Sequence, residues 1–233
     1  MNKNKKIYIG VVGQIACGKG VLVDALKKHG FVSFSLSSIL HNDLERKGIT
    51  KFTRRTLQDM GDELRKKYGR DILAKRAIKI LDSKHQISNK HKIQNSKPFK
   101  ISNLKNSNLF VTRKLEFGVY PKRYIIEGIR NTAEVEYLKS LPNFTLIGIK
   151  AKRSVRFHRL LQRRKPWDPK TWEEFLIVDR RDLGVGQKSE GQQVGKCLAY
   201  CDYVLTNNKD KRDFERKVKK LLEKINLASN PRG

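Results

Sequence analysis

The stretch Gly13-Gln14-Ile15-Ala16-Cys17-Gly18-Lys19-Gly20 decides how this chain is expected to fold. It follows the apolar run of residues 7–12 and precedes a helical pattern that begins at Val21. A strand, a glycine-bounded loop ending in Gly-Lys, and then a helix form the arrangement of a phosphate-binding P-loop. The glycines let backbone N–H groups converge on phosphate oxygens, and the helix N-terminus adds partial positive charge. The alternative, an ordinary strand-to-helix turn, leaves Lys19 at a helix start, where a cation is disfavoured.

The residues after Lys19 indicate which group of P-loop proteins the chain resembles. The general motif continues with serine or threonine, whose hydroxyl binds magnesium, but Gly20 and Val21 stand here. A Lys-Gly ending resembles that of adenylate kinases and, more broadly, the nucleoside monophosphate kinase group. This resemblance implies ATP and Mg²⁺ as cofactors, with residues 13–21 binding ATP and the metal held mainly through water and phosphates. Val21 replaces the usual threonine of adenylate kinases and offers no hydroxyl to a phosphate.

Apolar strand runs alternate with helical patterns along the rest of the chain. Strands separated by helices pair in parallel through right-handed crossovers. The sequence therefore predicts an α/β fold, a five-stranded parallel P-loop kinase sheet with helices on both faces. The expected strands are residues 7–12, 31–35, 123–127, 144–149 and 203–206. The expected helices are residues 21–30, 37–47, 53–68, 70–82 and 211–225, and the stretches that follow the capping-box patterns at Asn131 and Thr171.

Residues 83–122 interrupt this alternation. They are rich in Asn, Ser, Lys and Ile, and three segments nearly repeat one another, at residues 86–90, 93–97 and 101–105. We interpret the stretch as a low-complexity basic insertion in a single domain of residues 1–233, because loop entropy rises slowly with length. The alternative is a basic arm that binds nucleic acid.

A second group of functional residues follows the third expected strand, in Glu127-Gly128-Ile129-Arg130. An acid that ends a strand beside the P-loop strand lies near magnesium and the phosphates. Nucleoside monophosphate kinases carry a similar acid, glycine and arginine, although the acid is more often aspartate. The resemblance implies that Glu127 organises Mg²⁺ through water and that Arg130 grips a substrate phosphate. Otherwise Glu127 is a capping or salt-bridging acid and Arg130 a solvated charge.

Arginines are concentrated in residues 153–182, where the resemblance places a small Arg-rich lid. Phosphoryl transfer spreads negative charge over three oxygens, and planar guanidinium groups suit that charge. With Lys19, Glu127 and Arg130, the candidate catalytic residues are Arg163, Arg180 and Arg181. The alternative is that these arginines solvate a helix of a basic protein. The arginines of this stretch are Arg153, Arg156, Arg159, Arg163, Arg164, Arg180 and Arg181.

Two further segments narrow the choice of phosphoryl acceptor. Residues 183–197 look like a region of dephospho-CoA-kinase-like and (deoxy)nucleotide-kinase-like proteins. Dephospho-CoA kinases place an aspartate after the second strand as the base for a hydroxyl acceptor, but residues 35–38 contain no carboxylate and the first is Asp43. This favours a phosphate acceptor, a nucleoside or deoxynucleoside monophosphate, framed by Arg54, Arg55 and Arg65. Dephospho-CoA kinase remains the alternative activity.

Composition limits the partners. Of 233 residues, 52 are Lys or Arg and 23 are Asp or Glu, a net charge of +29 that predicts anionic partners.

No apolar run reaches the roughly 20 residues that span a bilayer, and the basic start is not a signal peptide, so we expect a cytoplasmic protein without membrane contact. The three cysteines do not form a disulfide framework, and Cys197 and Cys201 are interpreted as buried thiols on a helix.

A protein of another class would explain the charge differently. A nucleotide-dependent nucleic-acid-binding protein without turnover would also be strongly basic. Aromatic residues make up only 8% of the chain and are not interleaved with the basic runs, so stacking platforms are not evident. We therefore expect only weak, nonspecific nucleic-acid binding that fades with salt.

Overall fold

The computed structural model describes residues 6–91 and 123–229. Its centre is a sheet of five strands in the order β2-β3-β1-β4-β5, and every pair of neighbours is parallel. The prediction of a five-stranded parallel α/β sheet is confirmed. The strands are β1 (Ile7–Gly13), β2 (Val32–Ser35), β3 (Arg123–Glu127), β4 (Phe144–Lys150) and β5 (Tyr203–Thr206).

Strand β1 lies in the middle of the sheet and is covered on both faces. Ile9 and Val11 are buried on one face, and Tyr8 and Val12 are buried on the other. A strand covered on both sides reads as a continuous apolar run, which is the pattern that the sequence shows. Gly10 interrupts the run because a Cβ there would lie 2.5 Å from the ring of Phe144.

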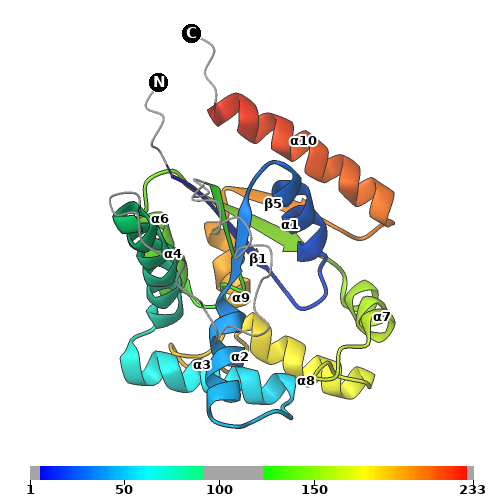
Figure 1. Cartoon of the computed structure of the whole chain (residues 1–233). Helices are drawn as coiled ribbons and strands as arrows, with labels where there is room; N and C mark the ends of the chain where they lie inside the picture. The colour runs from blue at the N-terminus through cyan, green and yellow to red at the C-terminus, as the bar shows by residue number, and fades with distance from the viewer. Residues whose placement is uncertain (1–5, 92–122, 230–233) are drawn as a thin grey trace.

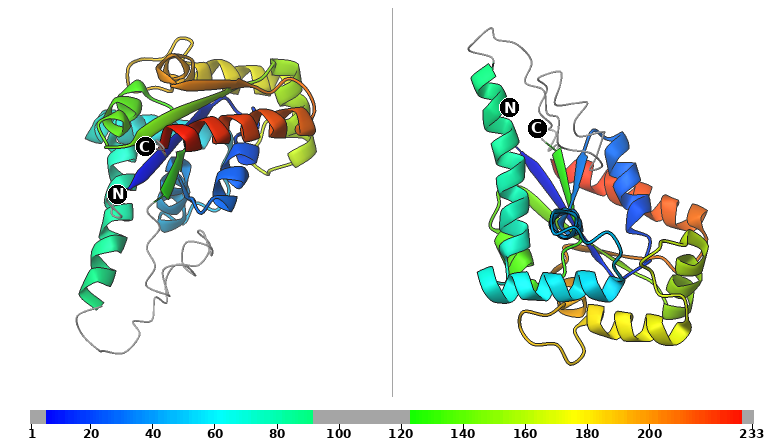
Figure 2. Two further views of the ribbon diagram at one scale, coloured as in Figure 1. Left: turned by 90° about the horizontal axis from the view of Figure 1, so that it is seen from above. Right: turned by 60° about the horizontal axis from the view of Figure 1, so that its bottom comes forward.

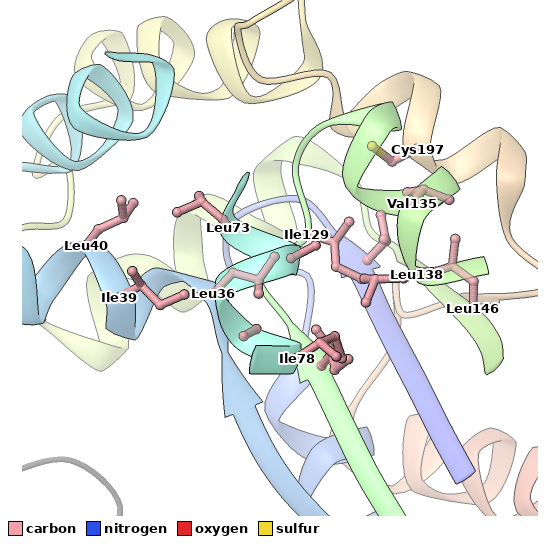
Figure 3. Packing of buried hydrophobic residues seen from close by; sticks show 14 of the residues in the cluster. Leu36, Ile39, Leu40, Leu73, Ile78, Ile129, Val135, Leu138, Leu146 and Cys197 are labelled. Carbon is pink, nitrogen blue, oxygen red and sulfur yellow. The ribbon is translucent and has the colours of Figure 1, made fainter. Parts of the chain in front are cut away.

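Helices cover both faces of the sheet, as predicted. Helices α1 and α10 pack on one face, and α2, α3, α4, α6 and α9 pack on the other (Figure 1). Figure 3 shows the second of these layers, where Leu36, Leu73 and Ile129 come together from three separate segments. The helices are α1 (Lys19–Lys28), α2 (Leu36–Arg46), α3 (Arg54–Tyr68), α4 (Ile72–His91), α6 (Thr132–Lys139), α7 (Arg153–Arg163), α8 (Trp172–Leu183), α9 (Val194–Cys197), the short 3₁₀ helix η1 (Leu198–Tyr200) and α10 (Lys211–Ser229).

Helix α4 is longer than the sequence pattern predicts. The apolar periodicity ends near Asp82, but the helix continues to His91, so the first nine residues of the expected insertion are helical. A helix whose first turns are already packed can propagate through residues without apolar periodicity, because only nucleation is costly. In Figure 2 the far part of α4 projects beyond the sheet. The remainder of the expected insertion, residues 92–122, lies outside the described residues.

Three helices begin with reciprocal capping boxes, and the sequence predicts two of them. The carboxylate of Glu134 accepts the backbone N–H of Asn131 at the start of α6, and the equivalent pair is Thr171 and Glu174 at the start of α8. Helix α3 has a third box, formed by Thr53 and Thr56. The usual pattern does not predict this box, because its third helical residue is threonine, not glutamate or glutamine.

Within residues 6–91 and 123–229, no helix combines the length and the apolarity needed to cross a bilayer.

Candidate active site

The loop between β1 and α1 has the close backbone approaches that a phosphate cradle requires. Gly18 has a φ of 103°, and a Cβ there would lie 2.2 Å from Nδ2 of Asn207. That amide donates a hydrogen bond of 2.9 Å to the carbonyl of Cys17, which ties the loop to the end of β5. At Gly13 a Cβ would lie 2.6 Å from the carbonyl oxygen of Ile149. Glycine is therefore required at both positions for the loop to keep this shape.

Lys19 is folded back over this loop. Its Nζ donates hydrogen bonds to the carbonyl oxygens of Gly13 at 2.6 Å and Gln14 at 2.9 Å. Burial lowers the pKa of Lys19, and the nearby Glu127 carboxylate opposes that shift. Two carbonyl groups of the loop thus hold the ammonium group of Lys19 in place.

Glu127 ends β3 beside the loop. Glu127 pairs in register with Val11 of β1, and its Oε1 accepts a hydrogen bond of 3.2 Å from the hydroxyl of Ser33. The next residue, Gly128, has a φ of 83° and lies under the N-terminus of α2, where a Cβ would come within 3.4 Å of the Ser37 nitrogen. The described residues contain no group of three or more carboxylate, histidine or cysteine side chains that could surround a metal ion. Glu127 therefore lies next to the loop without belonging to such a group.

Three arginines line a small cavity, of about 20 Å³, between α2, α3 and the segment after β3. They are Arg54, Arg65 and Arg130, and the described residues that line the cavity include no aspartate or glutamate. Burial, and then the positive charges of Arg54 and Arg65, lowers the pKa of Arg130 to about 9. The buried Nε of Arg54 has no hydrogen-bond partner among the described residues. Other residues that line this cavity are Ser37, Gln58, Gly128 and Gln192.

Glu134, which is fully buried, holds two of these arginines in place. Its Oε1 accepts a hydrogen bond of 2.9 Å from Nε of Arg65. Its Oε2 accepts the backbone N–H of Arg130 at 2.8 Å and that of Asn131 at 3.1 Å. One carboxylate therefore caps α6, fixes the backbone of Arg130 and neutralises Arg65.

The lid candidates lie on α7 and α8 and are mostly paired with carboxylates. Arg163 binds Asp168 through contacts of 2.6 and 2.8 Å, and Arg54 reaches the same carboxylate at 3.2 Å. Arg181 binds Asp59 at 2.6 Å and Asp62 at 2.9 Å.

Of the predicted site residues, Lys19, Glu127 and Arg130 lie close enough together for their charges to interact. Arg163 and Arg181 are engaged elsewhere, and Arg180 is exposed on α8. Arg54 and Arg65, which were expected to frame the acceptor, share the cavity with Arg130, whereas Arg55 is exposed.

Helix α8 contributes two buried carboxylates that sequence reasoning missed. Asp179 binds Arg156, also buried, at 2.6 Å, and accepts a hydrogen bond of 3.3 Å from the side chain of Gln14. Asp182 accepts the backbone N–H of Ile15 at 3.3 Å and forms an ion pair with Arg130. Within Asp179-Arg180-Arg181-Asp182, only the arginines were predicted to act. The signal that could have found the acids is their spacing of three residues, which places both on one face of a helix.

A second cavity, of about 630 Å³, opens at the other side of the loop. Gly18 and Val21 line it, together with Asn207 and with Arg159 of α7. Arg159 donates to the carbonyl of Asn207 at 3.1 Å and to its side-chain oxygen at 3.0 Å. This volume is within the range of small-ligand sites.

The two cysteines near the C-terminus do not share a helix, contrary to the expectation. Cys197 ends α9 and is buried, whereas Cys201 follows η1 and is partly buried. Burial raises the pKa of the Cys201 thiol to about 11 and raises that of Cys197 as well. Neither cysteine forms a disulfide.

No protein-family model matches the chain. The chain is similar to a UPF0200 protein of Hyperthermus butylicus, with 26% identity over 226 residues that cover 97% of this chain and 98% of that protein. It is also similar to the UPF0200 protein PH1008 of Pyrococcus horikoshii, with 28% identity over 222 residues, or 94% of this chain and 97% of that protein. These names state no activity.

Similar solved structures include shikimate kinase from Bacteroides thetaiotaomicron, with 15% identity and a TM-score of 0.48, covering 95% of this chain and 99% of that one. Dephospho-CoA kinase from Campylobacter jejuni matches with 18% identity and a TM-score of 0.41, covering 96% and 98% of the two chains. The chain itself has the α/β fold that its sequence predicts, a five-stranded parallel sheet with the glycine-bounded loop at the carboxyl end of the central strand.

Proposed function

We propose that this protein is an ATP-dependent phosphotransferase whose acceptor is a nucleoside or deoxynucleoside monophosphate. The observation that carries the proposal is the position of the arginine-lined cavity. Arg130, one of its lining residues, comes three residues after Glu127, and its charge acts on Lys19 of the loop. The cavity measures about 20 Å³ in this structure, so it would have to open to admit an acceptor. A donor phosphate in the loop and an anionic acceptor in the opened cavity would then meet between Lys19 and Arg130.

Residues 13–21 would bind the phosphates of ATP. The backbone N–H groups of the loop and the start of α1 supply the donors, and Lys19 would exchange its carbonyl partners for phosphate oxygens. The cavity beside Gly18 and Arg159 is large enough for the nucleoside part. Val21 lines that cavity and offers no hydroxyl, so the phosphates would depend on backbone donors and Lys19.

A magnesium ion fits this site when it is held mainly by water and phosphates. Mg²⁺ usually keeps several waters and is bound by one or two carboxylates together with substrate phosphates. Glu127 is a partly buried carboxylate beside the loop, oriented by Ser33, and would bind the ion through water. When bound, the ion would neutralise charge that develops on the phosphoryl oxygens.

The acceptor cavity supports an anionic substrate. A phosphate that attacks as an anion needs orientation and positive charge, whereas a hydroxyl benefits from a carboxylate base. Three guanidinium groups line the cavity, and the carboxylates that pair with them, Asp168, Glu134 and Asp182, are not among its described lining residues. Asp43, the first carboxylate after β2, is instead paired with Arg76 at 3.2 Å. These observations favour a monophosphate over the hydroxyl of dephospho-CoA.

Catalysis in this proposal is the positioning of two anions together with stabilisation of the transferring group. Lys19 would contact the outgoing phosphoryl oxygens, and Arg130 would bind the acceptor phosphate next to them. Arg163, Arg180 and Arg181 are proposed as lid residues that approach the phosphates. Arg163 and Arg181 would have to leave Asp168, Asp59 and Asp62 to do so.

Replacing Lys19 tests the proposal. Lys19→Ala should lower the rate of ADP release with ATP and a monophosphate acceptor by about 10²–10³, because one well-placed cationic stabiliser contributes roughly that factor. The matched control is Lys27→Ala, an exposed lysine in the last turn of the same helix, which should leave the rate unchanged. Equal rates for wild type and Lys19→Ala would refute the assignment.

A further inference from the structure

Asp182 occupies an unusual position between the two halves of the proposed site. It lies near the end of α8 and is 1% exposed. One of its carboxylate oxygens accepts the backbone N–H of Ile15, within the loop that would bind ATP phosphates. The other forms an ion pair with Arg130, within the cavity that would bind the acceptor. One buried carboxylate thus contacts a donor-side and an acceptor-side group.

The neighbouring acid of α8 has a different set of partners. Asp179 lies one turn earlier and is neutralised by Arg156 at 2.6 Å and Arg153 at 2.9 Å. Neither of these arginines lines the acceptor cavity, and the loop contact of Asp179 is to the side chain of Gln14. Asp179 can therefore keep its partners when phosphates bind. Asp182 cannot, because both of its partners are groups that an anionic substrate needs.

We propose that Asp182 is a placeholder anion, which occupies the Ile15 N–H and Arg130 in the ligand-free protein and is displaced when phosphates bind. A carboxylate offers two oxygens to these donors much as a phosphate group would. It places a negative charge beside a buried guanidinium and accepts a buried N–H while no substrate is present, which avoids the cost of leaving that charge and that donor without a partner. This inference rests on the proposed function, because it assigns those two groups to phosphate.

The displacement would couple the two substrates. A donor phosphate on Ile15 removes one partner of Asp182 and weakens its hold on Arg130. An acceptor phosphate on Arg130 removes the other partner and frees the loop N–H. Each anion therefore reduces the free-energy cost of displacing Asp182 for the other anion. Donor and acceptor should thus bind more tightly together than separately.

Asp182→Asn tests the inference with inorganic pyrophosphate as the probe. The amide has the same shape without the charge, so it competes less well for Arg130. We expect the dissociation constant for pyrophosphate, measured by calorimetry, to fall about tenfold, while the ligand-free protein unfolds at lower urea. The matched control is Glu173→Gln, which removes the same charge from an exposed position on α8 and should change the constant less than twofold.

The outcomes separate this inference from the proposed function. If wild type binds pyrophosphate and Asp182→Asn binds it equally or more weakly, Asp182 builds the site instead of occupying it, and the inference is overturned. If neither protein binds pyrophosphate, the phosphate site is absent and the proposed function fails with it. If Asp182→Asn does not fold, NMR of the wild type decides. The Ile15 amide and the Asp182 carboxyl carbon should shift with one pyrophosphate midpoint, and an unmoved carboxyl signal would overturn the inference.

Discussion

Glu134 holds the arginine-lined cavity together from behind. Its two oxygens bind the side chain of Arg65 and the backbone of Arg130 and Asn131, and the carboxylate itself is fully buried. Removing one partner of a buried ion pair is strongly destabilising, because it leaves an uncompensated charge. Neutralising this carboxylate should therefore destabilise the protein and change the shape of the cavity.

Glu134→Gln should lower the free energy of unfolding by about 2–4 kcal/mol, since the amide retains only part of the hydrogen bonding and none of the charge. Urea unfolding followed by circular dichroism measures the change. Glu136→Gln, an exposed position on the same helix, is the control and should stay within about 0.5 kcal/mol of wild type. Equal losses in the two variants would show that the buried carboxylate contributes no more to the free energy of unfolding than an exposed one.

At the level of single residues, sequence predicts the loop better than its surroundings. The spacing from Gly13 to Lys19 is set by local backbone chemistry, so a short pattern suffices to find it. The partners of Glu134 are 69 residues away in α3 and 4 residues away after β3, and no local pattern specifies such a pairing. Likewise Arg156 was expected among lid arginines, but it is buried against Asp179, because the packing of α7 on α8 decides its exposure.

Among the helices, α8 contacts the loop between β1 and α1 through two buried acids. It starts at a capping box formed by Thr171 and Glu174 and ends with Gly184 in the left-handed conformation. Between these ends it places Asp179 and Asp182 against the loop. The position of the two acids thus depends on where the helix begins and ends.

Thr171→Ala should destabilise the protein by about 1 kcal/mol, because the side chain that accepts the Glu174 N–H is lost. Thermal unfolding measures this effect. Thr50→Ala, at an exposed position outside the helices, is the control and should leave the unfolding temperature unchanged. A Thr171 variant as stable as its control would mean that tertiary packing alone holds the start of α8.

Helix starts could be predicted from the sequence where a specific side-chain pattern marks them, as at Asn131 and Thr171. Helix ends were less predictable. The end of α4 at His91 has no apolar periodicity to mark it, because a helix that leaves the packed core is continued by its own backbone hydrogen bonds. For the same reason, the sequence pattern did not predict that residues 83–91 are helical.

For the whole molecule, the order of strands and helices was predictable because each strand is an apolar run between helical patterns. The full strand order, β2-β3-β1-β4-β5, was not predicted, since apolar runs do not state which strands become neighbours. One pair was expected, because the strand that ends at Glu127 was placed beside the P-loop strand, and β3 does pair with β1. The acceptor cavity likewise needed the three-dimensional packing of α3 against the segment after β3.

The net charge of +29 predicts an interaction of the whole molecule with polyanions. We expect weak, sequence-independent binding to single-stranded nucleic acid at low salt that disappears near physiological salt, because it arises from counterion release. Fluorescence anisotropy over a salt series measures it. Deleting residues of about 85–118 should weaken this binding without abolishing ATP binding. Tight, salt-resistant binding to a defined nucleic acid, without phosphoryl transfer, would favour the non-catalytic alternative.

The transfer of the ATP γ-phosphoryl group, followed by ³¹P NMR, tests the central claim most directly. The protein is mixed with ATP, Mg²⁺ and, separately, each ribonucleoside and deoxyribonucleoside monophosphate or dephospho-CoA. The account predicts that at least one monophosphate gains a β-phosphate signal at the rate at which the γ signal of ATP disappears. A γ-phosphoryl group that appears only as orthophosphate, or only on the hydroxyl of dephospho-CoA, would contradict it.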